Sequence, residues 1–250
     1  MVTFRPYGRL GNFLFECATA YAFSLRHGLD FTVPHSTDNE EKNPVYLKHL
    51  INPKYDPTLT EAQIFEITHN YRELRFDESY RNRNVKILGY RQSEKYFSEF
   101  RDEILEAFAF PYDKLSGVVS IHVRRGDYVD LAEFHPPVTE EYINKAIEHF
   151  YSLGYTKFLF HSDDIDWCID MVKELHGVVR FYYSKNKSPI DDLISMSCCE
   201  HQICSNSTLA WWGWWLNRNE EKICIMPQVW FGEKLNKETK DIYPKNCIKL

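Results

Sequence analysis

The sequence predicts an α/β protein that is built on parallel sheets. In the second half of the chain, short apolar strands alternate with segments whose apolar residues recur at helical spacing. A strand–helix–strand pattern at the start of the chain points the same way. Several polar loops follow directly on apolar strands. Such an alternation predicts parallel sheets covered by helices on both faces.

The first unit begins with a strand at Val2–Phe4 and a loop at Arg5–Gly11. Apolar residues at helical spacing then predict a helix; they are Phe13, Leu14, Cys17, Ala18, Tyr21, Ala22 and Leu25. We expect Asn12 to cap this helix at its start and Gly28 to end it. A strand at Leu29–Val33 completes the unit.

The rest of the first half is less regular. His35–Tyr80 is rich in Asn and Pro, and it predicts short helices and long loops. A strand is expected at Val85–Leu88 and a helix at Ser93–Phe108. Pro111–Gly117 has the composition of a linker between domains.

This linker predicts two domains, residues 1–112 and residues 113–250. The second domain has five expected strands, at Val118–Val123, Lys157–Phe160, Val178–Tyr182, Gln202–Cys204 and Ile223–Met226. It has four expected helices, at Glu140–Leu153, Ile165–Leu175, Ile190–Cys198 and Thr208–Leu216. Thr139 is placed to cap the first of them. Ligands of such sheets bind at the carboxyl ends of the strands.

Composition excludes several classes of protein. The chain has 250 residues and a net charge of −6, with 44% apolar and 26% charged residues. These values are typical of a soluble globular protein, and the acidic balance argues against a nucleic-acid partner. We expect a cytoplasmic protein, because the sequence shows no signal peptide and no apolar run long enough to be a transmembrane segment. Peripheral association with a membrane stays open.

The strongest motif is Ser120-Ile121-His122-Val123-Arg124-Arg125-Gly126-Asp127-Tyr128. An apolar strand runs directly into two arginines, which are then expected at the ligand-binding edge of the sheet. Arginine binds phosphate oxygens through two parallel hydrogen bonds and keeps its charge. Gly126 permits a tight turn, and His122 is expected to be structural rather than catalytic. The alternative is an exposed basic pair in a surface loop.

A second motif, Ser162-Asp163-Asp164, follows another apolar strand. These acids could accept hydrogen bonds from a ribose or a purine, or one of them could cap the helix that begins at Ile165. Both interpretations stay open at this point. Asp164 and Asp166 also form an Asp-x-Asp pattern, which many metal-dependent glycosyltransferases contain. In this strand–helix setting we expect no metal site.

A third motif combines hydroxyl groups with the start of an aromatic helix. Ser205, Ser207 and Thr208 follow a strand and precede a segment with two Trp pairs around Gly213. Free N–H groups and the dipole at a helix N-terminus favour phosphate. Most of the four tryptophans are expected to pack in the core, although one of them could stack on a sugar.

A fourth motif, Gly8-Arg9-Leu10-Gly11-Asn12, precedes the first helix. It lacks the Gly-x-Gly-x-x-Gly pattern of dinucleotide-binding loops. Its two glycines still predict a loop that could close over a ligand.

Taken together, the four motifs resemble those of the α-1,2-fucosyltransferases, glycosyltransferase family 11. The matching residues occur in the expected order from Gly8 to Gly213, so the resemblance covers most of the chain. The His-x-Arg-Arg-x-Asp element at His122–Asp127 is also seen in α-1,6- and protein O-fucosyltransferases. It is therefore more specific for GDP-fucose than for a linkage. One departure is Phe13, where the family usually has Gln.

The resemblance implies a GT-B-like fold of two Rossmann-type domains, with acceptor-side residues in the first and GDP-fucose in the second. It implies transfer of fucose to a galactose-type hydroxyl of a glycan with inversion, and without a metal or another cofactor. Arg124 and Arg125 would lie at the diphosphate, and Asp163 or Asp164 at guanine or ribose. The donor-binding residues would be His122, Arg124, Arg125, Ser162, Asp163, Asp164, Ser205, Ser207, Thr208 and Gly11.

The catalytic residues implied in this way are Arg124, Asn12 and Asp127. Asp127 is the first candidate for the base that deprotonates the acceptor, followed by Asp130 and Glu133. Asp127 could instead orient an arginine, and the reaction could proceed without a strong base. Three other functions stay open: a GDP-fucose transferase of another linkage or acceptor, a non-catalytic GDP-sugar or glycan-binding module, and a metal-dependent transferase.

Overall fold

The chain forms two compact units in a computed structural model that describes residues 1–34, 59–64, 71–175, 179–185, 188–235 and 237–250. The first unit comprises Met1–Phe110 and Glu238–Pro244, and the second comprises Pro111–Lys237 and Lys245–Leu250. The expected domains were residues 1–112 and 113–250. The structure differs from this expectation because a segment near the C-terminus returns to the first unit.

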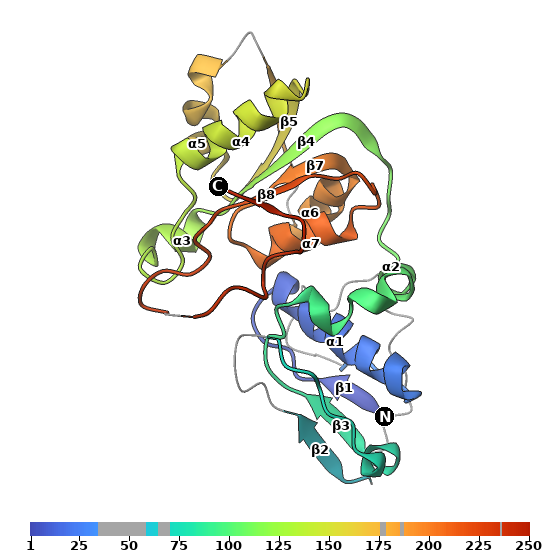
Figure 1. Ribbon diagram of the computed structural model, residues 1–250. Helices are drawn as coiled ribbons and strands as arrows, with labels where there is room; N and C mark the ends of the chain where they lie inside the picture. The colour runs from blue at the N-terminus through green and yellow to red at the C-terminus, as the bar shows by residue number, and fades with distance from the viewer. Residues whose placement is uncertain (35–58, 65–70, 176–178, 186–187, 236) are drawn as a thin grey trace. The chain divides into compact units, whose positions relative to one another are not determined.

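A three-stranded parallel sheet forms the centre of the first unit (Figure 1). Its order is β1-β3-β2, with β1 at Val2–Phe4, β3 at Asn84–Ile87 and β2 at Glu61–Ile64. We had expected no strand where β2 lies, within His35–Tyr80, much of which lies outside the described residues. The strand expected at Leu29–Val33 is reduced to one bridge between Phe31 and Val2.

Helix α1, Leu10–His27, packs on this sheet and is 18 residues long. It begins two residues before Asn12, so Arg9 occupies the N-cap position, and no side chain caps the helix. The prediction that Asn12 caps the helix was therefore wrong. Gly28 ends the helix with φ 61° as predicted, because glycine adopts this left-handed conformation without strain.

The helix expected at Ser93–Phe108 is divided into three pieces. Two 3₁₀ turns, η4 at Glu94–Tyr96 and η5 at Ser98–Phe100, precede α2 at Arg101–Phe108. The break falls at Phe97, whose backbone is not helical (φ −147°, ψ −3°) and whose side chain is fully buried. Its ring packs against Phe15 of α1, with the two ring centroids 6.1 Å apart. Burial of this aromatic ring accompanies the interruption of the helical pattern.

The second unit contains a six-stranded parallel sheet with the order β6-β5-β4-β7-β8-β9. The strands are β4 (Leu115–Val123), β5 (Lys157–Ser162), β6 (Arg180–Tyr183), β7 (Cys199–Ile203), β8 (Cys224–Met226) and β9 (Ile248–Lys249). Parallel sheets in both units confirm the predicted α/β class. Strand β9 was not predicted, and β4 starts within the expected linker Pro111–Gly117.

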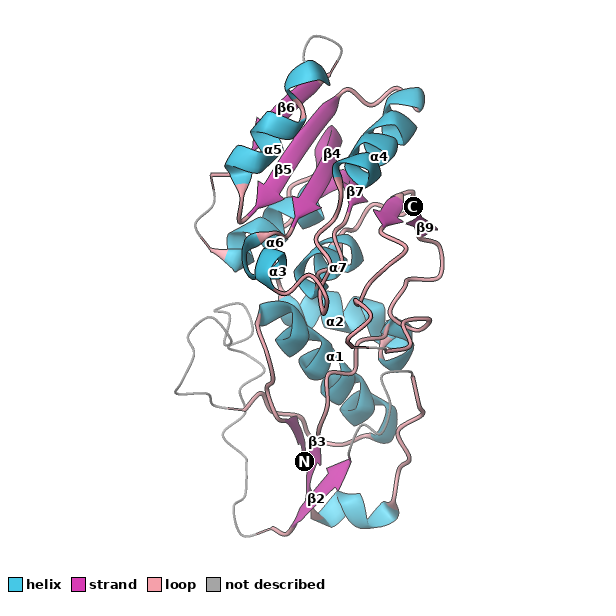
Figure 2. Cartoon of the chain, turned by 90° about the vertical axis from the view of Figure 1, so that its left-hand side faces the viewer, coloured by secondary structure: helices cyan, strands magenta, loops and turns pink. Residues whose placement is uncertain are grey.

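Helices cover this sheet on both faces (Figure 2). They are α3 (Gly126–Asp130), α4 (Glu140–Ser152), α5 (Ile165–Met171, followed by a 3₁₀ turn, η6, at Lys173–Leu175), α6 (Pro189–Cys198) and α7 (Thr208–Leu216). Val119, Ile121 and Val123 of β4 share one core with α4 and α5. Because side chains alternate along a strand, Ser120 and His122 face the opposite side, where α6 and α7 pack on each other. A further 3₁₀ turn, η3, lies in the first unit at Glu78–Asn82.

Candidate active site

Three adjacent strands of the second unit place their polar loops at one edge of the sheet. Val123, at the end of β4, is paired with Ser162 of β5, and Ile121 is paired with Ile203 of β7. The loops that follow these strands therefore begin side by side. This is the edge at which parallel α/β sheets bind their ligands.

Arg124 is held by two carboxylates that come from different elements. Its Nη1 lies 2.8 Å from Oδ2 of Asp163, and its Nη2 lies 2.5 Å from Oδ1 of Asp127. Asp163 follows β5, whereas Asp127 belongs to the short helix α3. The guanidinium also lies over the ring of Tyr128, 5.8 Å from its centroid. The Arg124 side chain is 23% exposed, so an anion from solvent can reach this positive charge.

Arg125 packs against the start of α5. Its Nε donates to Oδ2 of Asp164 at 3.0 Å, and its guanidinium lies 4.2 Å from the ring centroid of Trp167. A guanidinium at this distance over tryptophan makes a favourable cation–π contact. The two guanidinium groups therefore have different partners, and neither is an unpaired surface charge.

The question of which acid caps α5 is settled by the structure. Asp164 accepts a hydrogen bond from the Trp167 N–H at 3.2 Å, while its own N–H donates to Oγ of Ser162 at 2.9 Å. Asp163 instead accepts the backbone N–H of Arg125 at 2.9 Å. Within the described part of the chain, no three acidic, histidine or cysteine side chains are grouped to hold a metal ion.

His122 lies buried directly behind the arginines. Its Nδ1 is 2.8 Å from Oγ of Ser205, which is also buried. Burial, followed by the charge of Arg124, lowers the pKa of His122 to about 3. The imidazole is therefore neutral near pH 7. His122 and Ser205 thus hydrogen-bond to each other behind the edge, and their predicted contact with the donor stays a prediction.

The loop after β7 is anchored by Asn206, to which the sequence analysis assigned no role. Its side-chain amide donates to the carbonyl oxygens of Pro136 at 3.0 Å and Trp230 at 2.9 Å. It therefore ties two other loops to this edge. In the sequence, the position of Asn206 between two serines is a hint of this role, but its hydrogen-bond partners lie far away along the chain.

The predicted hydroxyl groups sit at the start of α7. Ser207 caps the helix by accepting the Leu209 N–H at 3.3 Å, and Thr208 is the first helical residue. Three of the four tryptophans of α7 are buried, namely Trp211, Trp212 and Trp215. This confirms that most of them pack in the core.

Gly11 and Asn12 belong to the first unit, so their predicted place at the donor and the reaction centre stays a prediction. Gly11 is buried inside α1. Oδ1 of Asn12 accepts from Nε2 of Gln92 at 2.8 Å, and a Cβ on Gly8 would lie 2.3 Å from Nδ2 of Asn12. Gly8 is therefore required where the loop approaches this amide.

Glu16 is a further residue that contributes to this region, and no sequence motif indicated it. This carboxylate is almost completely buried, and it accepts the backbone N–H of Tyr7 at 3.0 Å. From inside the apolar helix it therefore holds Tyr7, in the loop that precedes α1. In the sequence, the hint of this role is that Glu16 is the one acid within the apolar stretch Phe13–Phe23.

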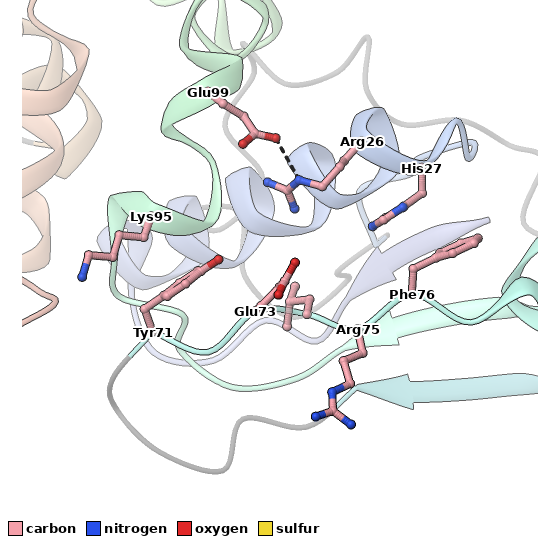
Figure 3. A pocket seen from close by; sticks show the side chains of 9 residues that line it. Arg26, His27, Tyr71, Glu73, Arg75, Phe76, Lys95 and Glu99 are labelled. Carbon is pink, nitrogen blue, oxygen red and sulfur yellow. Dashed lines mark hydrogen bonds and ion pairs between the residues drawn. The ribbon is translucent and has the colours of Figure 1, made fainter.

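A separate cavity of about 450 Å³ lies in the first unit (Figure 3). It is lined by Arg26, His27, Tyr71, Glu73, Leu74, Arg75, Phe76, Lys95 and Glu99. Two of these lining residues, Arg26 and Glu99, form an ion pair, with Nε and Oε1 2.8 Å apart. His27 is 15 residues beyond Asn12 in α1, a rise of about 22 Å along a helix. The cavity is therefore distinct from the loop at Gly8–Asn12.

The three candidate bases have different surroundings. Asp127 touches Arg124, and its side chain is 40% exposed. Glu133 forms an ion pair with Lys234. Asp130 is exposed at the end of α3. Of these three, Asp127 is the one whose contact places it beside the candidate diphosphate ligand.

The family model described as "Glycosyl transferase family 11" matches residues 1–250. The O-antigen biosynthesis glycosyltransferase WbnK of Escherichia coli is 28% identical over 82% of this chain and 78% of the relative. An alpha-1,2-colitosyltransferase of Escherichia coli is 34% identical over 61% of this chain, which spans 59% of that relative. The galactoside alpha-(1,2)-fucosyltransferase 2 of Hylobates lar is 28% identical over 86% of this chain and 69% of the relative.

Solved structures of POFUT1 share weaker similarity. The apo form has a TM-score of 0.47 at 13% identity, over 90% of this chain and 96% of that chain. A complex with GDP-fucose has a TM-score of 0.36 at 12% identity, and the match covers 58% of this chain and 53% of that chain.

No helix among the described residues combines the length and apolar character that a membrane crossing requires.

Proposed function

Since this chain belongs to glycosyl transferase family 11, we propose that it transfers L-fucose from GDP-fucose to a galactose-type hydroxyl of a glycan. The proposed product has an α-1,2 linkage that is formed with inversion. The observation that carries the proposal is Arg124, a partly exposed guanidinium at the carboxyl end of β4. A galactoside alpha-(1,2)-fucosyltransferase that aligns with 86% of this chain supports the linkage.

Arg124 has the chemistry that a departing diphosphate needs. When the bond to fucose breaks, negative charge grows on the β-phosphate of GDP. A guanidinium held in place stabilises this charge more in the transition state than in the ground state. The N-terminus of α7, with Ser207 and Thr208, supplies further hydrogen-bond donors for phosphate. We propose that these groups act without a metal ion.

Asp127 is the proposed base. The acceptor hydroxyl loses a proton as it attacks the anomeric carbon, and a carboxylate beside the diphosphate can accept that proton. Asp127 combines solvent exposure with a direct contact to Arg124. For guanine and ribose we propose Ser162, the last residue of β5, together with Asp164, which lies two residues further on.

A second candidate donor is a colitosyl nucleotide sugar. It is favoured by the colitosyltransferase, whose 34% identity exceeds that of the fucosyltransferase. The proposed roles of Arg124 and Asp127 are the same for either sugar.

The test is an assay of nucleotide release in EDTA. Purified protein is incubated with a panel of galactosides and, separately, with GDP-fucose, GDP-colitose, GDP-mannose or UDP-galactose. We expect GDP from GDP-fucose alone, and an α-1,2 linkage by NMR of the product. Arg124→Ala is expected to lower kcat about 10²–10³-fold, since it removes a charge contact of the transition state. Asp127→Asn is expected to lower kcat about 10²-fold or more.

Arg218→Ala is the matched control, because this exposed arginine of the same unit lies over Tyr112 and is not part of the site. Release that requires added Mn²⁺ would contradict the metal-independent mechanism. GDP binding without turnover on the whole panel would favour a binding module. Release from GDP-colitose alone would establish the second candidate donor.

A further inference from the structure

Asp163 contacts both residues of the arginine pair, Arg124 and Arg125. Its Oδ2 lies 2.8 Å from Nη1 of Arg124, and its Oδ1 accepts the Arg125 N–H at 2.9 Å. Both oxygens of Asp163 therefore contact the arginine pair, whereas only one oxygen of Asp164 does so. The side chain is 26% exposed, less than that of Asp127.

The same carboxylate accounts for Gly126. A Cβ on Gly126 would lie 2.5 Å from Oδ2 of Asp163 and 3.2 Å from its carboxyl carbon. Gly126 is the first residue of α3, and its φ is not in the left-handed region, so the backbone itself does not demand glycine. A larger residue at this position would have to displace the carboxylate of Asp163 from its present place.

Asp163 also attaches Arg124 to another strand. Asp127 lies three residues from Arg124, so its contact is local to one short segment of the chain. Asp163 follows β5, which is paired with β4 up to Val123 and Ser162. Its contact therefore fixes the guanidinium relative to the sheet.

From these contacts we propose that Asp163 is a positioning residue that fixes the guanidinium of Arg124 for the diphosphate, and that it does not bind the nucleoside. The inference rests on the proposed function. A fixed charge contributes to catalysis because it does not have to reorganise as the reaction proceeds, and a small displacement costs much of its effect.

A double-mutant cycle separates this role from direct contact with the donor. The wild type, Asp163→Asn, Arg124→Ala and the double variant are compared by the dissociation constant for GDP and by kcat and KM for the donor. Asn keeps an acceptor for the Arg125 N–H but loses the charge that holds Arg124. We expect Asp163→Asn to weaken GDP binding and lower kcat by about tenfold, and to have less than a twofold effect once Arg124 is absent. Equal effects in both backgrounds would overturn the proposal, because they indicate direct contact with the ligand.

Gly126→Ala is an independent probe of the same carboxylate. The new methyl group displaces Oδ2, so this variant should lose activity as Asp163→Asn does. In an Asp163→Ala background the same change should have no effect. Asp166→Asn is the matched control, because this exposed acid lies one turn away on α5. Thermal melting verifies that each variant is folded.

The wild-type measurements separate failure of the proposed function from failure of this inference. If the wild type binds GDP without transferring a sugar, the proposed function fails, and the cycle in GDP affinity still decides the role of Asp163. If the wild type does not bind GDP at all, both proposals are overturned.

Discussion

His122 and His161 are two buried histidines that lie opposite each other on β4 and β5. Nε2 of His161 is 2.9 Å from Oγ of Ser195, and its Nδ1 is 3.3 Å from Oγ of Ser120. Burial, followed by the proximity of His122, lowers the pKa of His161 to about 3. Both rings are therefore neutral hydrogen-bonding groups in the folded protein, and neither is placed to exchange protons with a substrate at neutral pH.

This burial predicts a loss of stability in acid. The pKa of each histidine is about 3 in the folded state and 6.5 by the ordinary value, so below pH 6.5 the unfolded chain binds protons that the folded chain does not. Between pH 6.5 and about pH 3, the free energy of unfolding should fall by about 1.4 kcal/mol per histidine for each unit by which the pH is lowered. Urea unfolding between pH 7.5 and 5 measures this slope.

His122→Asn should reduce the slope, because Asn keeps a hydrogen-bonding group near Ser205 and does not titrate. His149→Asn is the comparison variant, because His149 is a half-buried residue of α4. An unchanged slope in His122→Asn would show that the ring is protonated in the folded state.

At the scale of elements, α6 and α7 pack closely at Gly213. A Cβ on this glycine would lie 2.8 Å from the Cβ of Met196 in α6. Three buried tryptophans around it fill the remaining space on α7. The glycine between the two Trp pairs therefore permits this helix pair to approach.

Gly213→Ala tests this packing. Alanine in a helix interior is favoured by about 1 kcal/mol over glycine, but overpacking a core costs about 1–3 kcal/mol. We expect a net loss of about 1 kcal/mol in the free energy of unfolding, measured in urea. Glu148→Ala at an exposed position of α4 should change it by less than about 0.5 kcal/mol. A Gly213→Ala protein that is as stable as the wild type would contradict the close packing.

At the scale of the whole molecule, the segment Glu238–Pro244 belongs to the first unit, although the residues before and after it belong to the second. Asp241 is buried, forms an ion pair with Lys95, and accepts the Tyr71 N–H at 2.9 Å. Burial opposes its charge, but the hydrogen bonds from Lys95 and Tyr71 outweigh burial and lower the pKa of Asp241. The charged carboxylate is thus a long-range link within this unit.

Asp241→Ala should destabilise the first unit more than the second. Loss of the carboxylate leaves the Tyr71 N–H without this acceptor, at a cost of about 1–3 kcal/mol. Hydrogen exchange should accelerate in β1 and β3 but not in β4 and β5. Lys240→Ala, whose side chain is 71% exposed, is the control. Equal acceleration in both units would show that they unfold together.

How far the sequence predicts this fold depends on the range of the interactions. Thr139 caps α4 and Gly28 ends α1 as expected, because caps and helical periodicity depend on neighbouring residues. Asn12 failed as a cap because α1 starts earlier, and the helix at Ser93–Phe108 was broken where Phe97 is buried. Those outcomes depend on packing against distant residues.

The sequence alone determined the α/β class, the polar loops after β4, β5 and β7, and the resemblance to the family, because each is written in short stretches of the chain. Only the tertiary structure decided that these three strands are neighbours, that Asp164 caps α5, and that Asp163 holds Arg124. Asp163 and Arg124 are 39 residues apart, so no local pattern could pair them. Their contact exists because parallel pairing brings the ends of β4 and β5 together.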